Sequence, residues 1–122
     1  MNPRSALVVE DDPQIQRLLQ ESLQDEGYEV RAALNGREAL DLLDGWLPDI
    51  ILLDLLMPVM DGRRFRAEQL RLDLGVAVPL LVLSASRDGR GVARELSATE
   101  FVAKPFELDD LLDAVERCSR VG

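Results

Sequence analysis

Histidine is absent from this 122-residue chain, and cysteine and lysine occur only once each. Without an imidazole, the chain has no histidine general base, no histidine metal ligand and no phosphohistidine of its own. The single Cys118 cannot form an internal disulfide, and together with the lack of a signal peptide this predicts a reducing, cytoplasmic location. Asp49, Asp54 and Pro58 interrupt the longest apolar stretch, so no membrane-spanning segment is expected.

The composition is 47% hydrophobic and 30% charged, which suits one folded domain over residues 1–122. The formal net charge is -9. A negative charge of this size opposes nonspecific binding to nucleic acid or to an anionic membrane, so we expect neither as a direct partner. The chain carries thirteen arginines but only Lys104, which lies in an apolar segment directly before a proline.

Short apolar runs alternate with segments of helical periodicity along the whole chain. Strands are expected at about residues 6–9, 28–32, 50–53, 80–83 and 101–103, and helices at about 13–26, 36–44, 62–72, 90–96 and 107–120. Asp12 is interpreted as the N-cap of the first helix, with Ile15, Leu18, Leu19 and Leu23 on its apolar face. Five strand-helix units predict an α/β fold, a parallel sheet covered on both faces by helices.

Each of four predicted strands is followed by polar side chains of a particular kind. They are Glu10, Asp11 and Asp12 after the first strand, Asp54 after the third, Ser84 after the fourth and Lys104 after the fifth. The carboxyl ends of parallel strands meet at one edge of a sheet, where open α/β folds place their chemistry. The sequence therefore predicts that these side chains converge.

Four segments together resemble the receiver domain of bacterial two-component response regulators. They are Val8-Val9-Glu10-Asp11-Asp12, the run from Asp54 to Gly62 containing Met57-Pro58-Val59-Met60-Asp61, Ser84-Ala85, and Lys104-Pro105-Phe106. The resemblance covers essentially the whole chain. It implies a single-domain (βα)5 flavodoxin-like fold, a doubly wound parallel sheet with strand order 2-1-3-4-5.

The resemblance also implies a function in phosphorelay signal transduction. Asp54 would accept a phosphoryl group from the phosphohistidine of a sensor histidine kinase or a histidine phosphotransfer protein. Glu10, Asp11, Asp54 and the backbone carbonyl of Leu56 would hold Mg2+, which suits oxygen ligands. Three carboxylates about 5 Å apart would otherwise repel by roughly 3 kcal/mol per pair at an effective dielectric constant near 20.

The resemblance gives the remaining residues two kinds of role: orienting the phosphoryl group, and coupling phosphorylation to a change in the partner-binding surface. Lys104 would pair with Asp54 and later with a phosphoryl oxygen, and the Ser84 hydroxyl would donate to another. Movement of Ser84 would be coupled to Phe101, which is also expected to contribute to the core. The fourth helix, fifth strand and fifth helix would bind an output partner, whose identity is unknown, and could support a weak homodimer.

Two departures from the family pattern generate hypotheses. The step from Ser84 to Lys104 is shorter than usual, Ser97-Ala98 replaces a usual Gly-Ala, and two glycines fall near the fourth helix. A short or partly unwound fourth helix is therefore expected. Leu56 stands where a polar side chain helps to orient the attacking water, which predicts slow self-dephosphorylation.

Three other functions compete with the signalling interpretation. A phosphorylation-independent interaction module would need none of the acidic residues, hydroxyl or lysine. A phosphatase of the haloacid dehalogenase type needs a second aspartate two residues after the nucleophile, where this chain has Leu56. A flavodoxin needs a phosphate-binding first loop, but this one is acidic. The sequence thus favours a receiver that catalyses its own phosphorylation and dephosphorylation and is not otherwise an enzyme.

Overall fold

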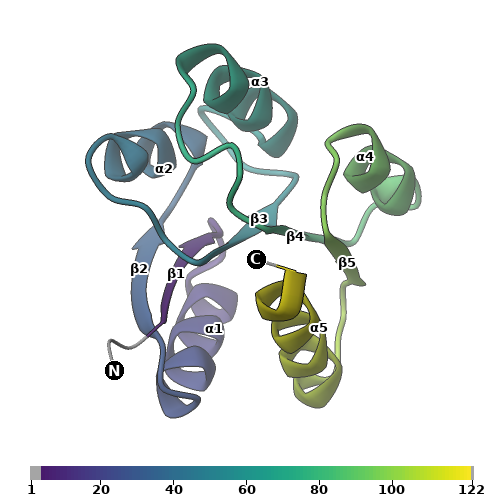
Figure 1. Ribbon diagram of the computed structural model, residues 1–122. Helices are drawn as coiled ribbons and strands as arrows, with labels where there is room; N and C mark the ends of the chain where they lie inside the picture. The colour runs from purple at the N-terminus through teal and green to yellow at the C-terminus, as the bar shows by residue number, and fades with distance from the viewer. Residues whose placement is uncertain (1–3, 122) are drawn as a thin grey trace.

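The computed structural model describes residues 4–121, which form five strands alternating with five helices. In chain order they are β1 Ser5–Val9, α1 Pro13–Asp25, β2 Glu29–Ala33, α2 Gly36–Leu43, β3 Ile50–Asp54, α3 Gly62–Leu72, β4 Leu80–Ser84, α4 Gly89–Glu95, β5 Glu100–Ala103 and α5 Leu108–Val121. All strand pairs are parallel, and their order is β2-β1-β3-β4-β5. The predicted doubly wound sheet is confirmed (Figure 1).

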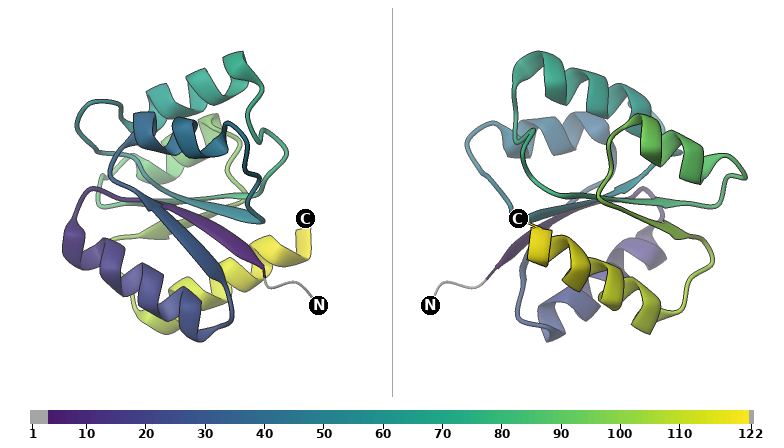
Figure 2. Two further views of the ribbon diagram at one scale, coloured as in Figure 1. Left: turned by 90° about the vertical axis from the view of Figure 1, so that its left-hand side faces the viewer. Right: turned by 45° about the vertical axis from the view of Figure 1, so that its right-hand side comes forward.

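The sheet separates two hydrophobic cores. Helices α1 and α5 cover one face, and α2, α3 and α4 cover the other (Figures 1 and 2). Every residue of the central strands β3 and β4 is buried, which explains why their sequences, IILLD and LLVLS, do not alternate between apolar and polar. Cys118 is buried on the α5 side, where desolvation raises the pKa of its thiol to about 12, consistent with an unreactive cysteine.

Side-chain caps fix where the first three helices begin. The Asp12 carboxylate accepts hydrogen bonds from the backbone N–H groups of Gln14, at 2.9 Å, and Ile15, at 3.2 Å. This confirms the predicted N-cap of α1. Asn35 and Asp61 cap α2 and α3 in the same way. Such caps typically contribute about 1 kcal/mol each.

Two sequence expectations about helix faces and lengths have different outcomes. Leu18, predicted on the apolar face of α1, is 42% exposed, because the buried line of this helix runs through Leu19, Ser22 and Leu23 instead. Helix α4 is short, as expected, with seven residues from Gly89 to Glu95.

Strands β3 and β4 each extend one residue further than expected, so Asp54 and Ser84 are the last residues of their strands.

Helices α1, α3 and α4 end in the same backbone motif, which requires a left-handed residue. That residue is Gly27 after α1, Asp73 after α3 and Ser97 after α4, with φ values of 94°, 55° and 59°. After α4, the N–H of Ser97 donates to the carbonyl of Arg94 and the N–H of Ala98 donates to that of Ala93. This is the Schellman pattern, and residues with a Cβ fit it less well than glycine.

We expect Ser97→Gly to raise the free energy of unfolding by about 1 kcal/mol, because it removes the steric cost of a side chain at positive φ. Urea unfolding followed by circular dichroism measures the change. Ser97→Ala is the matched control and should give no gain, since alanine keeps the Cβ. Gly27→Ala should destabilise by a similar amount, because a Cβ there meets no atom within 4 Å and only the backbone conformation opposes it. A gain with Ser97→Ala equal to that with Ser97→Gly would contradict the explanation.

Candidate functional site

Three carboxylates converge at the carboxyl edge of the sheet, as the sequence predicts. Glu10 and Asp11 directly follow β1, and Asp54 ends the neighbouring strand β3, where Val9 is paired with Leu53. One carboxylate oxygen from each of Glu10, Asp11 and Asp54 lies within 4.8 Å of the others. The Glu10 side chain is fully buried, and Asp54 is only 5% exposed. The three acidic groups therefore form one cluster in which Glu10 and Asp54 are buried and Asp11 is half-buried.

Lys104, which follows the edge strand β5, supplies the positive charge that pairs with these carboxylates. Its ammonium Nζ lies 2.6 Å from Glu10 Oε1 and 3.5 Å from Asp54 Oδ2. Its backbone N–H donates to the carbonyl of Ser84 at 2.9 Å, which continues the β4-β5 pairing beyond the end of β5. The following Lys104-Pro105 peptide bond is cis. The expected pairing with Asp54 is present, but the shorter contact, to Glu10, was not predicted.

Burial dominates the electrostatics of the cluster. Desolvation raises the pKa of Glu10 to about 7, although hydrogen bonds from Lys104 and from the backbone N–H of Asp12 act in the opposite direction. Desolvation also raises the pKa of Asp54, and the charge of Lys104 opposes that rise. Two charges 4.8 Å apart repel by roughly 3 kcal/mol at an effective dielectric constant near 20. One lysine cannot neutralise three carboxylates, so this oxygen-only cluster fits a hard divalent cation such as Mg2+.

Gly89, which was not predicted as a site residue, lies close to both Ser84 and Phe101. Ser84 is 1% exposed, and its Oγ accepts a hydrogen bond from the N–H of Ser86 at 3.0 Å. A Cβ added to Gly89 would lie 2.9 Å from the Ser84 Cβ and 3.1 Å from the Phe101 ring atom Cε1. The first residue of α4 thus contacts both predicted switch residues, and any side chain there would displace one of them.

Arg90 makes a second unpredicted contact with the switch region. Its guanidinium carbon lies 4.9 Å from the centroid of the Phe101 ring, in the geometry of a cation-π interaction. Phe101 itself is partly buried and packs on the core formed with α2, α3 and α4. In the sequence, only the two glycines near α4 indicated that a neighbouring side chain packs closely against this helix. Their spacing did not identify Ser84 and Phe101 as the neighbours.

The loop after β3 exposes Leu56, the residue expected to slow self-dephosphorylation. Leu56 is 65% exposed, and its N–H donates to Asp54 Oδ1 at 3.4 Å. Gly62 closes the loop: its N–H donates to the Leu55 carbonyl at 2.9 Å, and an added Cβ would lie 2.9 Å from the Leu55 Cα. This geometry explains the need for glycine at that position. The assignment of the Leu56 carbonyl as a metal ligand stays a prediction.

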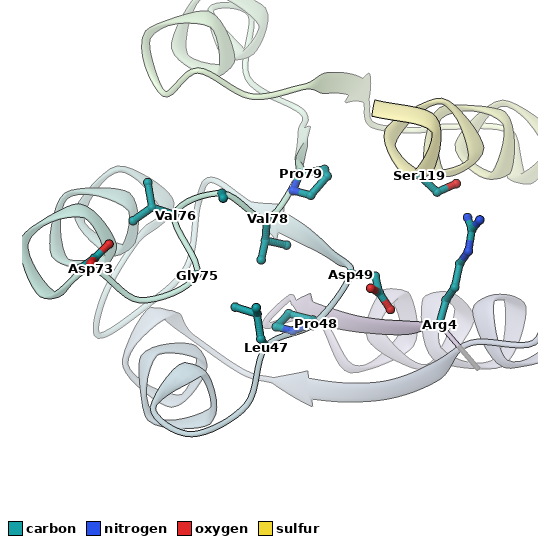
Figure 3. A pocket seen from close by; sticks show the side chains of 11 residues that line it. Arg4, Leu47, Pro48, Asp49, Asp73, Gly75, Val76, Val78, Pro79 and Ser119 are labelled. Carbon is teal, nitrogen blue, oxygen red and sulfur yellow. The ribbon is translucent and has the colours of Figure 1, made fainter. Parts of the chain in front are cut away.

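A groove at the opposite edge of the sheet is separate from the acidic cluster (Figure 3). It is lined by the segments that enter β3 and β4, including Leu47, Pro48, Val78 and Pro79. Among the polar residues that line this groove, Asp49 has a structural role, because its carboxylate accepts a hydrogen bond from the N–H of Ser5 at 2.8 Å. The chemistry-bearing residues predicted from the sequence all lie at the other edge.

Comparison with known proteins agrees with the fold. The family model described as the response regulator receiver domain matches residues 6–116. The chain belongs to the response regulator receiver domain family. Within residues 4–121 of this receiver domain, no helix is both long and apolar enough to cross a membrane.

Individual relatives differ in how much of their length the receiver domain represents. The response regulator MprA of Mycolicibacterium vanbaalenii is 41% identical over 112 residues, which cover 90% of this chain and 48% of the relative. The chain therefore spans about half the length of that relative. Sporulation initiation phosphotransferase F of Bacillus subtilis is 35% identical over 111 residues, covering 91% of this chain and 90% of the relative.

A solved structure shows the same fold with a metal-containing ligand. The response regulator TrrA of Thermotoga maritima, solved in complex with Mg2+-BeF, superimposes with a TM-score of 0.82 at 35% identity. The match covers 94% of this chain and 98% of TrrA.

The raised pKa of Glu10 predicts how stability depends on pH when metal is removed. Between the ordinary pKa of 4.5 and the raised value of about 7, the folded protein keeps a proton that the unfolded chain has lost. The free energy of unfolding in EDTA should therefore fall as pH rises through this interval, by on the order of 2 kcal/mol. Urea unfolding at several pH values measures this fall.

The variant Glu10→Gln provides the control for this pH dependence, because it removes the titrating group while keeping a side chain of the same shape. Its stability should decline less than that of the parent between pH 4.5 and pH 7. Parallel curves for the two proteins would show that Glu10 does not contribute the predicted dependence.

Proposed function

We propose that this receiver domain is a phosphoacceptor in a two-component phosphorelay. Asp54 takes a phosphoryl group from the phosphohistidine of a sensor histidine kinase or a histidine phosphotransfer protein. The observation that carries the proposal is the position of Asp54, which has two further carboxylates within 4.8 Å and the Lys104 ammonium 3.5 Å from its Oδ2. The family membership and the phosphotransferase name of the Bacillus subtilis relative support it.

The proposed transfer needs no chemistry beyond that of the two side chains that exchange the group. An Asp54 carboxylate oxygen attacks phosphorus, the bond from phosphorus to the donor imidazole nitrogen breaks, and its electron pair stays on that nitrogen. Asp54 becomes an acyl phosphate, and the chain needs no histidine of its own. Most of the catalysis in such transfers comes from positioning and charge stabilisation.

Residues around Asp54 have distinct roles in the proposal. Glu10, Asp11, Asp54 and the carbonyl of Leu56 would hold Mg2+, which when bound supplies positive charge against the oxygens of the incoming phosphoryl group. Lys104 would exchange part of its contact with Glu10 and Asp54 for a phosphoryl oxygen. The Ser84 hydroxyl would donate a hydrogen bond to another phosphoryl oxygen. Gly89 lies close to both Ser84 and Phe101, so a movement of Ser84 would also change the packing of these two residues.

The proposed output is a change in a partner-binding surface. Phosphorylation at Asp54 would alter the surface formed by α4, β5 and α5, which would bind an output partner and could support a weak homodimer. We propose that residues 1–122 act as one receiver domain in the cytoplasm, with self-catalysed phosphorylation and dephosphorylation as their only reactions. Direct nucleic acid binding is not part of this proposal.

The decisive experiment is intact mass spectrometry after incubation with Mg2+ and acetyl phosphate. The expected result is one Mg2+-dependent phosphoryl adduct that hydroxylamine removes. Asp54→Asn, which keeps the shape of the side chain but is a far weaker nucleophile, should show no adduct. Because the chain contains no histidine, a hydroxylamine-labile adduct points to an acyl phosphate.

Two outcomes would count against the phosphoacceptor role. An adduct that persists in Asp54→Asn would place the phosphoryl group elsewhere. A folded, Mg2+-binding parent that takes no phosphoryl group from acetyl phosphate or from a phosphorylated histidine phosphotransfer protein would favour a phosphorylation-independent interaction module.

The exposed Leu56 predicts a long-lived phosphorylated form. An apolar side chain two residues after Asp54 cannot orient a water molecule for attack on the acyl phosphate. We expect Leu56→Asn to accelerate loss of the adduct roughly fivefold, the effect of one added hydrogen bond worth about 1 kcal/mol. Leu56→Met is the control of similar size and should decay like the parent. Equal decay rates for the Asn and Met variants would refute this explanation.

A further inference from the structure

Gln16 connects helix α1 to the ends of two strands at the acidic edge. Its side-chain Nε2 donates to the carbonyl oxygen of Glu10 at 3.0 Å and to that of Ala33 at 3.2 Å. Glu10 follows the last residue of β1, and Ala33 is the last residue of β2. The two N–H groups of a single amide thus hold two backbone carbonyls, one of which belongs to a residue of the carboxylate cluster.

The Glu10 carbonyl depends on this contact because the strand has already ended. The N–H of Glu10 still pairs with the carbonyl of Ala33 at 3.0 Å, the last backbone contact between the ends of β1 and β2. The Glu10 carbonyl, by contrast, lies beyond the paired residues of β1. The Gln16 side chain takes the place of a neighbouring strand as its hydrogen-bond donor.

The position of Gln16 is itself fixed by the beginning of α1. Its backbone N–H donates to the carbonyl of Asp12 at 2.9 Å, and the Asp12 side chain caps the same turn. The turn that carries Gln16 therefore begins only one residue after Asp11. A side chain anchored so close to the acidic loop can hold that loop without a long, flexible connection.

We propose that Gln16 is a positioning residue for the metal-binding half of the site. The Glu10 carbonyl belongs to the peptide group that joins Glu10 to Asp11, so holding this oxygen fixes the plane of that peptide. The plane determines the directions in which the two acidic side chains leave the backbone. Gln16 thereby aims both carboxylates at Asp54 without itself contacting the cation, an inference that rests on the proposed Mg2+-dependent function.

Other contacts to Glu10 cannot replace this one. Its carboxylate accepts from Lys104 Nζ and, at 3.2 Å, from the N–H of Asp12. Both contacts act on the side-chain end, and Lys104 would have to loosen its hold when a cation or a phosphoryl group arrives. The Gln16 contact acts on the backbone and can persist through that exchange. Groups that orient metal ligands from outside the coordination sphere typically affect metal affinity by 10–100-fold.

The test compares Mg2+ binding by the whole chain and by Gln16→Met, using isothermal titration calorimetry. Methionine has a similar length and shape but no N–H to donate. We expect the Kd for Mg2+ to rise about tenfold in Gln16→Met. Gln14→Met is the matched control, because Gln14 is exposed in the same helical turn and its side chain makes no hydrogen bond among those found in residues 4–121. The control should bind Mg2+ like the parent.

Unfolding in EDTA separates a positioning role from a purely structural one. A structural role would lower the stability of Gln16→Met but leave the Mg2+ affinity of the folded fraction unchanged, and that result would overturn the proposal. If Gln16→Met does not fold, Gln16→Ala removes the same donors with a better helix former. Failure of both variants to fold would also overturn the proposal. A parent that does not bind Mg2+ would instead overturn the metal-dependent function itself.

Discussion

The contact of one ammonium group with two buried carboxylates is the constraint on which the rest of the structure depends. Glu10 and Asp54 stand at the ends of adjacent strands, where they are almost fully removed from water. Buried charges are tolerated only with a partner, and Lys104 is that partner. Lys104 follows β5, two strands away from β3, so the order β2-β1-β3-β4-β5 is what allows one lysine to reach both acids across β4.

The short helix α4 contacts residues of the molecule at both of its ends, and one of them is Ser84 at the carboxyl edge of the sheet. At its beginning, Gly89 contacts Ser84 and Phe101. At its end, the buried Arg66 of α3 donates from Nε to the carbonyl of Leu96 at 3.0 Å. Helix α4 has only seven residues, so these two contacts lie close together along the chain. If Asp54 accepts a phosphoryl group as proposed, a displacement of Ser84 would reach α4 through Gly89.

Much of the fold and of the site could be predicted from the sequence because hydrophobic periodicity and strand ends carry that information. Continuous apolar runs gave the buried strands, and polar residues directly after them gave Asp54, Ser84 and the acidic pair. The contacts of Gly89 and the shorter of the two Lys104 contacts could not be predicted. They depend on close packing and on the reach of one extra methylene in Glu10, which a one-dimensional pattern does not contain. Leu18 was wrongly predicted to lie on the buried face of α1, because helical periodicity in a sequence defines that face only to within one residue.

The acidic edge shows why stability and function oppose each other in this protein. Three carboxylates within 4.8 Å are unfavourable for folding, and one lysine offsets only part of the repulsion. Protein surfaces without a function relieve such repulsion by separating the charges. Here, backbone contacts to Gln16 and Ala33 hold Glu10 in place against the repulsion. Under the proposed function, a divalent cation would relieve this repulsion on binding, so the unfavourable arrangement of carboxylates would favour cation binding.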